Sequence, residues 1–165
     1  MKQGELARID YTARNAANEV VDTTIAEEAR KAGIYVESMV YKPILVAVGK
    51  EMVLKGVDEA LLEMEEGQEK SFLIQKEKAF GDRREELIKL VPLEAFRKQN
   101  MDPFPGMPLE IDGLPCRVQS VSGGRVRVDF NHRLAGKDLN YWVRVLKKYS
   151  TPEEKLAACG EEFLL

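Results

Sequence analysis

Alternating apolar and polar residues predict strands near both ends of the chain. Ala7, Ile9, Tyr11 and Ala13 alternate with charged or hydroxyl-bearing residues, which is the two-residue period of a half-buried strand. The same alternation returns over residues 139–145. Shorter strands are predicted over residues 19–22, 43–49 and 69–76. Because the two longest patterns lie at opposite ends of the sequence, one sheet formed from both ends is expected.

A helical period separates two of the short strands. Val57, Ala60, Leu61 and Met64 recur at spacings of three and four residues, which predicts an amphipathic helix. Gly67 follows this pattern and favours the end of the helix before it.

Two further helices are predicted from their N-terminal residues. Thr24 and Glu27 have the spacing of a capping box, which predicts a short helix over residues 25–32. Thr151 and Glu154 have the same spacing, with a proline at the first helical position, and they predict a C-terminal helix.

Prolines concentrate between residues 87 and 130, which hold five of the seven in the chain. Within this region a short helix is predicted over 92–98, and Ser122–Gly124 has the composition of a hairpin turn. Three strands are predicted over residues 107–111, 115–121 and 125–130. Residues 86–130 are therefore interpreted as a small subdomain inserted into the first.

The composition leaves few residues for metal, covalent or phosphate chemistry. His132 is the only histidine, and neither it nor the cysteines have the close pairing of zinc ligands. Phosphate-binding glycine loops and nucleophile motifs are absent. No metal or cofactor is expected. An apolar, aromatic set of residues remains in the first domain, and its spacing alone favours a barrel core.

The charge and the cysteines bear on location and partners. The net charge is −3, and no run approaches the roughly 18 apolar residues of a membrane span. Cys116 and Cys159 are interpreted as reduced thiols of a cytoplasmic protein, with a disulfide or redox contact as the alternative. A basic strip from Arg125 to Lys137 fits either a nucleic-acid surface or an outward strand face, and neither a nucleic-acid nor a membrane partner is expected.

Four local motifs, taken in order along the chain, resemble the FKBP family of peptidyl-prolyl cis/trans isomerases. They are Tyr11-x₁₀-Asp22, Val48-Gly49-Lys50-x-x-Val53-Leu54-x-Gly56-Val57, Ala79-Phe80-Gly81 and Asn131-His132-x-Leu134-Ala135-Gly136. The last is similar to the SlyD-like branch, in which a chaperone subdomain called insert-in-flap interrupts the loop before the last strand. The long segment 23–43 is more similar to archaeal members.

The resemblance implies an α+β fold: an antiparallel half-barrel wrapped on a short helix, with a small, mostly β inserted subdomain. The isomerase domain would comprise residues 1–85 and 131–150. The insert-in-flap domain would comprise residues 86–130, and residues 151–165 would form a helical tail.

The resemblance also implies a set of site residues. The catalytic set would be Tyr11, Asp22, Val53, Leu54, Phe80 and Tyr141, and the substrate-binding pocket would add Ile44, Val46, Val57 and Leu134. Val57 stands where the family often has tryptophan, and Phe80 where it usually has tyrosine, so a wider and less polar pocket is expected. Asp22 would either meet the substrate carbonyl or hold Tyr11 by a hydrogen bond, and the second role is favoured.

The apolar residues of the insert have two interpretations. They are Met101, Phe104, Met107, Leu109, Ile111 and Leu114. They form either the small core of the subdomain or an exposed groove for unfolded chains, to which methionine is suited. The function expected is a prolyl isomerase that accelerates folding, with a chaperone insert. Its partners would be unfolded or proline-containing polypeptides and FKBP-type macrolide inhibitors. The alternative is a non-catalytic holdase.

Overall fold

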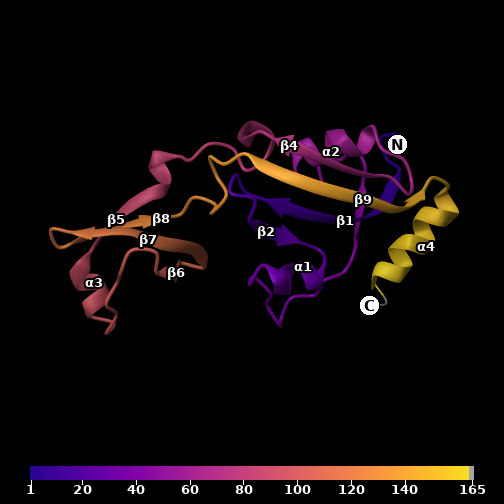
Figure 1. Ribbon diagram of the computed structural model, residues 1–165. Coiled ribbons are helices and arrows are strands. Elements are labelled where there is room, and N and C mark those ends of the chain that lie inside the picture. The colour runs from indigo at the N-terminus through magenta and orange to yellow at the C-terminus, as the bar shows by residue number, and fades with distance from the viewer. Residues whose placement is uncertain (164–165) are drawn as a thin grey trace. The chain divides into compact units, whose positions relative to one another are not determined.

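A computed structural model of the chain describes residues 1–163, and it divides into two compact units (Figure 1). The first unit comprises Met1–Gly81 and the residues from Gly136 onward. The second unit is Asp82–Ala135. Both are built on antiparallel sheets with few helices, so the predicted α+β class is confirmed. Residues 86 and 130, the predicted limits of the insert, lie inside the second unit.

The first unit is a five-stranded antiparallel sheet. Four strands follow the order β2 (Val20–Thr23), β1 (Leu6–Arg14), β9 (Leu139–Tyr149) and β4 (Glu69–Ile74), and β3 (Ile44–Ala47) also pairs with β1. The two patterned ends of the chain therefore lie side by side as β1 and β9, as the alternation predicted.

Cross-strand neighbours share one face of a sheet, so the register shows which side chains project together. Ala13 lies opposite Asp22 on β2 and opposite Tyr141 on β9. Ile44 lies opposite Ile9. One face of the sheet therefore carries residues from all three of these pairings.

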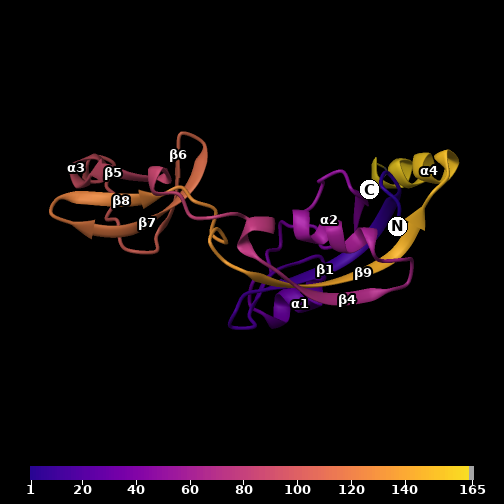
Figure 2. The ribbon, with the colours of Figure 1, turned by 90° about the horizontal axis from the view of Figure 1, so that it is seen from above.

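Helix α2 (Lys55–Leu62) lies along this face (Figure 2). Gly56 allows the close approach, because a Cβ at this position would come within 2.6 Å of Ile74 Cγ2 on β4. Ile74 pairs with Leu139 and so lies on the same face as Tyr141. The buried residues Val57 and Leu61 of α2 complete this core.

The capping box predicted at Thr24 does not form. Helix α1 (Ala26–Lys31) has Ile25 as its N-cap, without a side-chain bond. The Thr24 hydroxyl instead donates to Asp10 Oδ1 at 2.7 Å and accepts the Tyr11 N–H at 3.0 Å. The prediction was wrong because the side chain of Thr24 is already used to fasten this segment to β1.

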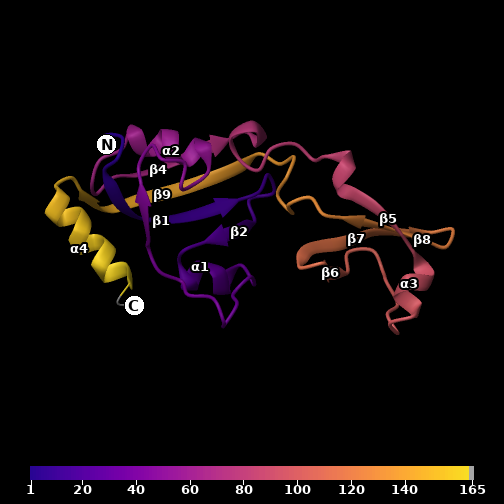
Figure 3. The same cartoon turned by 180° about the vertical axis from the view of Figure 1, so that it is seen from behind.

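The capping box predicted at Thr151 does form and begins α4 (Pro152–Phe163). Glu154 accepts the Thr151 N–H at 3.0 Å, and Thr151 Oγ1 accepts the Glu154 N–H at 3.2 Å. The helix returns beside the sheet (Figure 3), where Arg8 of β1 donates to Glu162 at 3.0 Å. No helix among the described residues is both long and apolar enough to cross a membrane.

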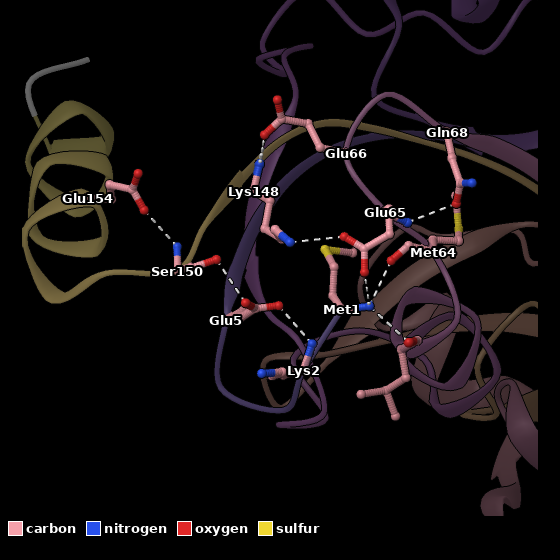
Figure 4. A network of polar contacts seen from close by, with 11 residues as sticks. Met1, Lys2, Glu5, Met64, Glu65, Glu66, Gln68, Lys148, Ser150 and Glu154 are labelled. Carbon is pink, nitrogen blue, oxygen red and sulfur yellow. Dashed lines mark hydrogen bonds and ion pairs between the residues drawn. The ribbon is translucent and has the colours of Figure 1, made fainter.

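A polar network joins the N-terminus to the end of α2 and to β9 (Figure 4). The Met1 ammonium donates to the carbonyl oxygens of Leu62 at 2.9 Å and Met64 at 2.7 Å. It also lies 3.3 Å from a carboxylate oxygen of Glu65, whose other oxygen accepts from Lys148 at 2.9 Å. A cation near the carboxyl end of a helix is favoured by the helix dipole.

The second unit is a four-stranded antiparallel sheet with one short helix. Its strand order is β5 (Ile88–Pro92), β8 (Arg125–Asp129), β7 (Leu114–Ser122) and β6 (Pro108–Ile111), with α3 (Leu93–Arg97) after β5. Phe96 of α3 packs on Val118, Val126 and Val128 to form the core. The predicted helix and three strands are present, whereas β5 was missed.

Candidate active site

Two tyrosines and an aspartate form the polar part of the candidate site. The rings of Tyr11 on β1 and Tyr141 on β9 stack with centroids 5.7 Å apart and planes inclined at 29°. Tyr11 Oη donates a hydrogen bond to Asp22 Oδ2 at 2.9 Å. These three residues come from three adjacent strands and share the face that α2 covers.

Burial raises the pKa of both tyrosine hydroxyls, which are protonated at neutral pH even at their ordinary pKa of about 10. It raises the pKa of Tyr11, and the nearby charge of Asp22 raises it further. The same two causes, in the same order, raise the pKa of Tyr141. The Tyr11 hydroxyl is therefore a hydrogen-bond donor across the physiological pH range, which is what the bond to Asp22 requires.

Aliphatic residues extend the same face. Ile44 and Val46 of β3 pair with Ile9 and Ala7 of β1, so their side chains project from the same face of the sheet as Tyr11. Val57 of α2 is only 2% exposed. The structure thus places five of the predicted residues on the face of the sheet along which α2 lies, and a sixth on α2 itself: Tyr11, Asp22, Ile44, Val46 and Tyr141, with Val57.

Val53 and Leu54 lie in the loop that leads into α2, and both are half-buried. This loop is held by Asp58, a buried residue that the sequence reasoning missed. Its carboxylate accepts the Gly49 N–H at 2.7 Å and the Glu51 N–H at 2.9 Å. The available signal was an acidic residue beside Val57, within the apolar pattern of the helix.

Phe80 and Leu134 are placed differently. Phe80 is half-buried and follows the short helix η1 (Lys76–Lys78) in the first unit. Leu134 belongs to the second unit and is buried, and its N–H donates to His132 Nδ1 at 3.1 Å. Burial and the nearby Arg133 lower the pKa of His132, consistent with an accepting, uncharged Nδ1. The participation of both residues in the pocket stays a prediction, as does that of Val53 and Leu54.

The cluster offers an apolar, aromatic surface with one hydrogen-bonded carboxylate. It has no nucleophile paired with a base. In the described part of the chain, no group of three or more His, Cys, Asp or Glu side chains is arranged to hold a metal ion. The arrangement suits binding and non-covalent stabilisation of an apolar group.

Comparison with known families decides the identity. Residues 1–95 match the family described as FKBP-type peptidyl-prolyl cis-trans isomerase. The chain belongs to this family. The resemblance inferred from the four motifs is thereby confirmed, and the protein is a peptidyl-prolyl cis-trans isomerase whose substrates are polypeptides.

Individual relatives of this isomerase agree with the family match. A short-type peptidyl-prolyl cis-trans isomerase of Methanocaldococcus jannaschii is 37% identical over 145 residues, which cover 88% of this chain and 92% of that protein. The isomerase SlyD of Treponema pallidum is 29% identical over 163 residues, covering 93% of this chain and 81% of its own.

A second family match concerns the inserted part of the isomerase. Residues 89–134 match the family described as FKBP26, IF domain. These residues lie within the second unit, Asp82–Ala135. The inserted segment of this isomerase is therefore similar to a domain family of its own, separate from the family matched by residues 1–95.

Proposed function

We propose that the α2-facing cluster of the first unit binds the proline of the substrate and carries the isomerase reaction. The hydrogen bond between Tyr11 and Asp22, made by a tyrosine whose ring stacks on Tyr141, is the observation that supports this assignment. It fixes the orientation of the Tyr11 ring and holds a carboxylate on the same face as both rings. The proline ring would pack on these rings, with Ile44 and Val46 beside them.

The chemistry requires no proton transfer or covalent step. Twisting a peptide bond breaks its amide resonance, at a barrier of about 18–20 kcal/mol. The twisted amide has less charge separation than the planar one, so apolar surroundings favour it relative to water. Each tenfold in rate requires about 1.4 kcal/mol, and holding the substrate in a turn adds to this effect.

Within this proposal, Asp22 is a positioning residue. Its carboxylate accepts the hydroxyl of Tyr11 and so fixes the orientation of that ring. The other role considered from the sequence, a direct contact with the substrate carbonyl, would require this carboxylate to face an electron-rich oxygen. The geometry therefore favours the role of holding Tyr11.

An exchange measurement tests the assignment. NMR exchange of an X–Pro peptide is compared for the parent chain, Tyr141→Ala and a control, Trp142→Ala. Trp142 is the next residue on β9 and points to the opposite face of the sheet. We expect at least a tenfold loss of catalysis for Tyr141→Ala and a much smaller loss for the control. Equal effects would contradict the assignment.

We further propose that the second unit binds unfolded polypeptide and thereby assists folding. The six apolar residues of the predicted groove divide into two groups. Met101, Met107, Leu109 and Ile111 pack, partly buried, on the core around Phe96. Phe104 and Leu114 are each 58% exposed. Both interpretations of the sequence therefore have support: part of the set serves the core, and part is available to a client.

Binding near the isomerase would raise the local concentration of proline-containing segments. The proposal includes macrolide inhibitors as ligands of the Tyr11 cluster and a cytoplasmic location, in which both thiols would remain reduced. Neither is needed for the experiment below.

The chaperone proposal is tested by suppression of aggregation of a denatured protein. The variant Phe104→Ser with Leu114→Ser should lose most of the suppression. The control Leu73→Ser with Leu156→Ser removes two apolar residues of the first unit that are at least as exposed, and it should retain the suppression. If both variants suppress aggregation as well as the parent, the assignment of this surface is wrong.

A further inference from the structure

The sheet of the second unit has two faces of very different character. Val126 and Val128 of β8 face the core around Phe96 and are fully buried. Arg125 and Arg127 alternate with these valines along the strand, so they point to the other face, and both are exposed. We call this second side the arginine face.

The register defines a mixed apolar and cationic surface on the arginine face. Leu90 of β5 lies directly opposite Arg127, and Pro92 lies opposite Arg125. Leu90 is 56% exposed. An aliphatic row on β5 therefore runs beside a cationic row on β8, at the strand separation of about 4.8 Å.

The two arginines lack an acidic partner in the described part of the chain, since no carboxylate lies within 4.0 Å of either. The carboxylate on the same strand, that of Asp129, already has cationic partners. It pairs with Arg83 and lies 3.6 Å from Arg117. Arg125 and Arg127 are therefore cations without a paired carboxylate among the described residues.

We propose that the arginine face binds an extended polypeptide segment in which acidic and aliphatic residues are interspersed. Arg125 and Arg127 are two residues apart on one strand, so they repeat at about 6.8 Å. Alternate residues of an extended partner repeat at the same distance, and two carboxylates can therefore meet both guanidinium groups. Leu90 offers an apolar contact beside them.

The surface fits a polypeptide better than a nucleic acid. Single-stranded nucleic acids are held by stacking on exposed aromatic rings together with many phosphate contacts. The register assigns no aromatic residue of the four strands to the arginine face. Two such cations beside an aliphatic row are too few for tight phosphate binding.

The occupant is inferred from the proposed polypeptide binding by the second unit, but the surface is a different one. Phe104 and Leu114 do not belong to the arginine face: Phe104 precedes β6, and the register places Leu114 opposite Ile111, on the side of the core. Variants at Phe104 and Leu114 therefore separate the two proposals.

The test measures binding of a fluorescent ten-residue peptide of alternating leucine and glutamate to the full chain. A peptide with glutamine in place of glutamate is the neutral comparison. We expect the glutamate peptide to bind more tightly, with affinity that falls as salt rises from about 50 mM to about 500 mM. Arg125→Ser with Arg127→Ser should raise Kd about fivefold to twentyfold, as two exposed ion pairs predict.

Two controls make the result specific. Arg97→Ser with Arg144→Ser removes the same charge from exposed residues elsewhere and should leave Kd unchanged. Arg125→Glu with Arg127→Glu should transfer the preference to a peptide of leucine and lysine. This reversed preference also shows that the variant remains folded.

The proposal is overturned by equal binding of the glutamate and glutamine peptides, by an equal loss in the Arg97 and Arg144 control, or by displacement of the peptide by a single-stranded RNA at lower concentration. Loss of peptide binding in Phe104→Ser with Leu114→Ser, with no loss in the arginine variants, would also overturn it. Intact glutamate-peptide binding in that variant, together with lost aggregation suppression, would support both proposals separately.

Discussion

Removing the hydroxyl of Tyr11 isolates the hydrogen bond that supports the active-site assignment. Tyr11→Phe keeps the ring that stacks on Tyr141 and deletes only the donor to Asp22. Asp22→Ala deletes the acceptor from the other side. The two single variants and the double variant form a cycle that measures the coupling between the groups.

The magnitude follows from the type of bond. A hydrogen bond to a charged group contributes about 1.5–3 kcal/mol, and this one is 2.9 Å long between half-buried residues. Because Tyr11 is partly exposed, the lower end applies, and we expect a coupling of about 1–2 kcal/mol in the free energy of unfolding. If the bond orients the ring for substrate, kcat/KM should fall about tenfold in each single variant.

The assay is exchange of an X–Pro peptide by NMR, with chemical unfolding measured on the same proteins. A positioning role predicts that the double variant is little worse than either single variant in kcat/KM. Strictly additive losses, with a coupling below about 0.3 kcal/mol, would refute the positioning role of Asp22. Unchanged activity in Tyr11→Phe would show that this hydrogen bond does not contribute to the reaction.

Three other substitutions test single contacts. Asp129→Asn should destabilise the second unit by about 3 kcal/mol, because it removes the carboxylate that pairs with Arg83. Burial by itself would raise the pKa of Asp129, but the hydrogen bonds from Arg83 and Asn131 together lower it. The stability difference in urea is therefore full above the unfolded pKa of about 4 and disappears as pH falls through the folded value. Asp58→Ala should raise KM for prolyl peptides several-fold, since two loop N–H groups lose their acceptor; an unchanged KM would separate that loop from the site. Gly56→Val should cost about 1–3 kcal/mol in thermal unfolding by overpacking against Ile74, and Ile74→Ala should recover part of it.

The sequence predicted those parts of the fold in which the local pattern and the tertiary partner agree. The alternation in β1 and β9 predicted buried faces, and the two strands do pair. The spacing of Thr151 and Glu154 predicted a cap that forms. Thr24 and Glu27 have the same spacing, but the Thr24 hydroxyl binds Asp10 across the strands. A local pattern cannot show that a distant strand competes for the same side chain.

Most of the missed features depend on contacts between residues far apart in the chain. Asp129 is 1% exposed, and its partner Arg83 precedes β5. An apolar pattern assigns charged residues to the surface, so Asp129 was not predicted at a buried position. Strand β5 was missed because it has only five residues and ends in Pro92. For the site, the motifs predicted Tyr11, Asp22 and Tyr141 through a family resemblance, whereas the spacing alone favoured a barrel core.

In each unit, hydrogen bonds join the two segments at which the chain passes to the other unit. These bonds bear on whether the second unit can be removed. In the second unit, Asn131 Oδ1 accepts the Arg84 N–H at 2.9 Å, and its amide donates to the Arg84 carbonyl at 3.1 Å. In the first unit, the Gly136 N–H donates to the Gly81 carbonyl at 2.6 Å. Residues 81 and 136 are therefore close enough for a short turn to join them.

Replacing residues 82–135 by Asn-Gly, a sequence favoured in two-residue turns, should leave a folded first unit. Its unfolding free energy should change by less than about 1 kcal/mol, because the strand pairings of β1, β4 and β9 all lie within that unit. The measurement is urea unfolding followed by the stacked tyrosines, with backbone NMR dispersion as the check on folding. An unfolded product would show that the first unit depends on the second for its stability. A folded product with reduced turnover of short peptides would assign Leu134, or another residue of the second unit, to the prolyl pocket.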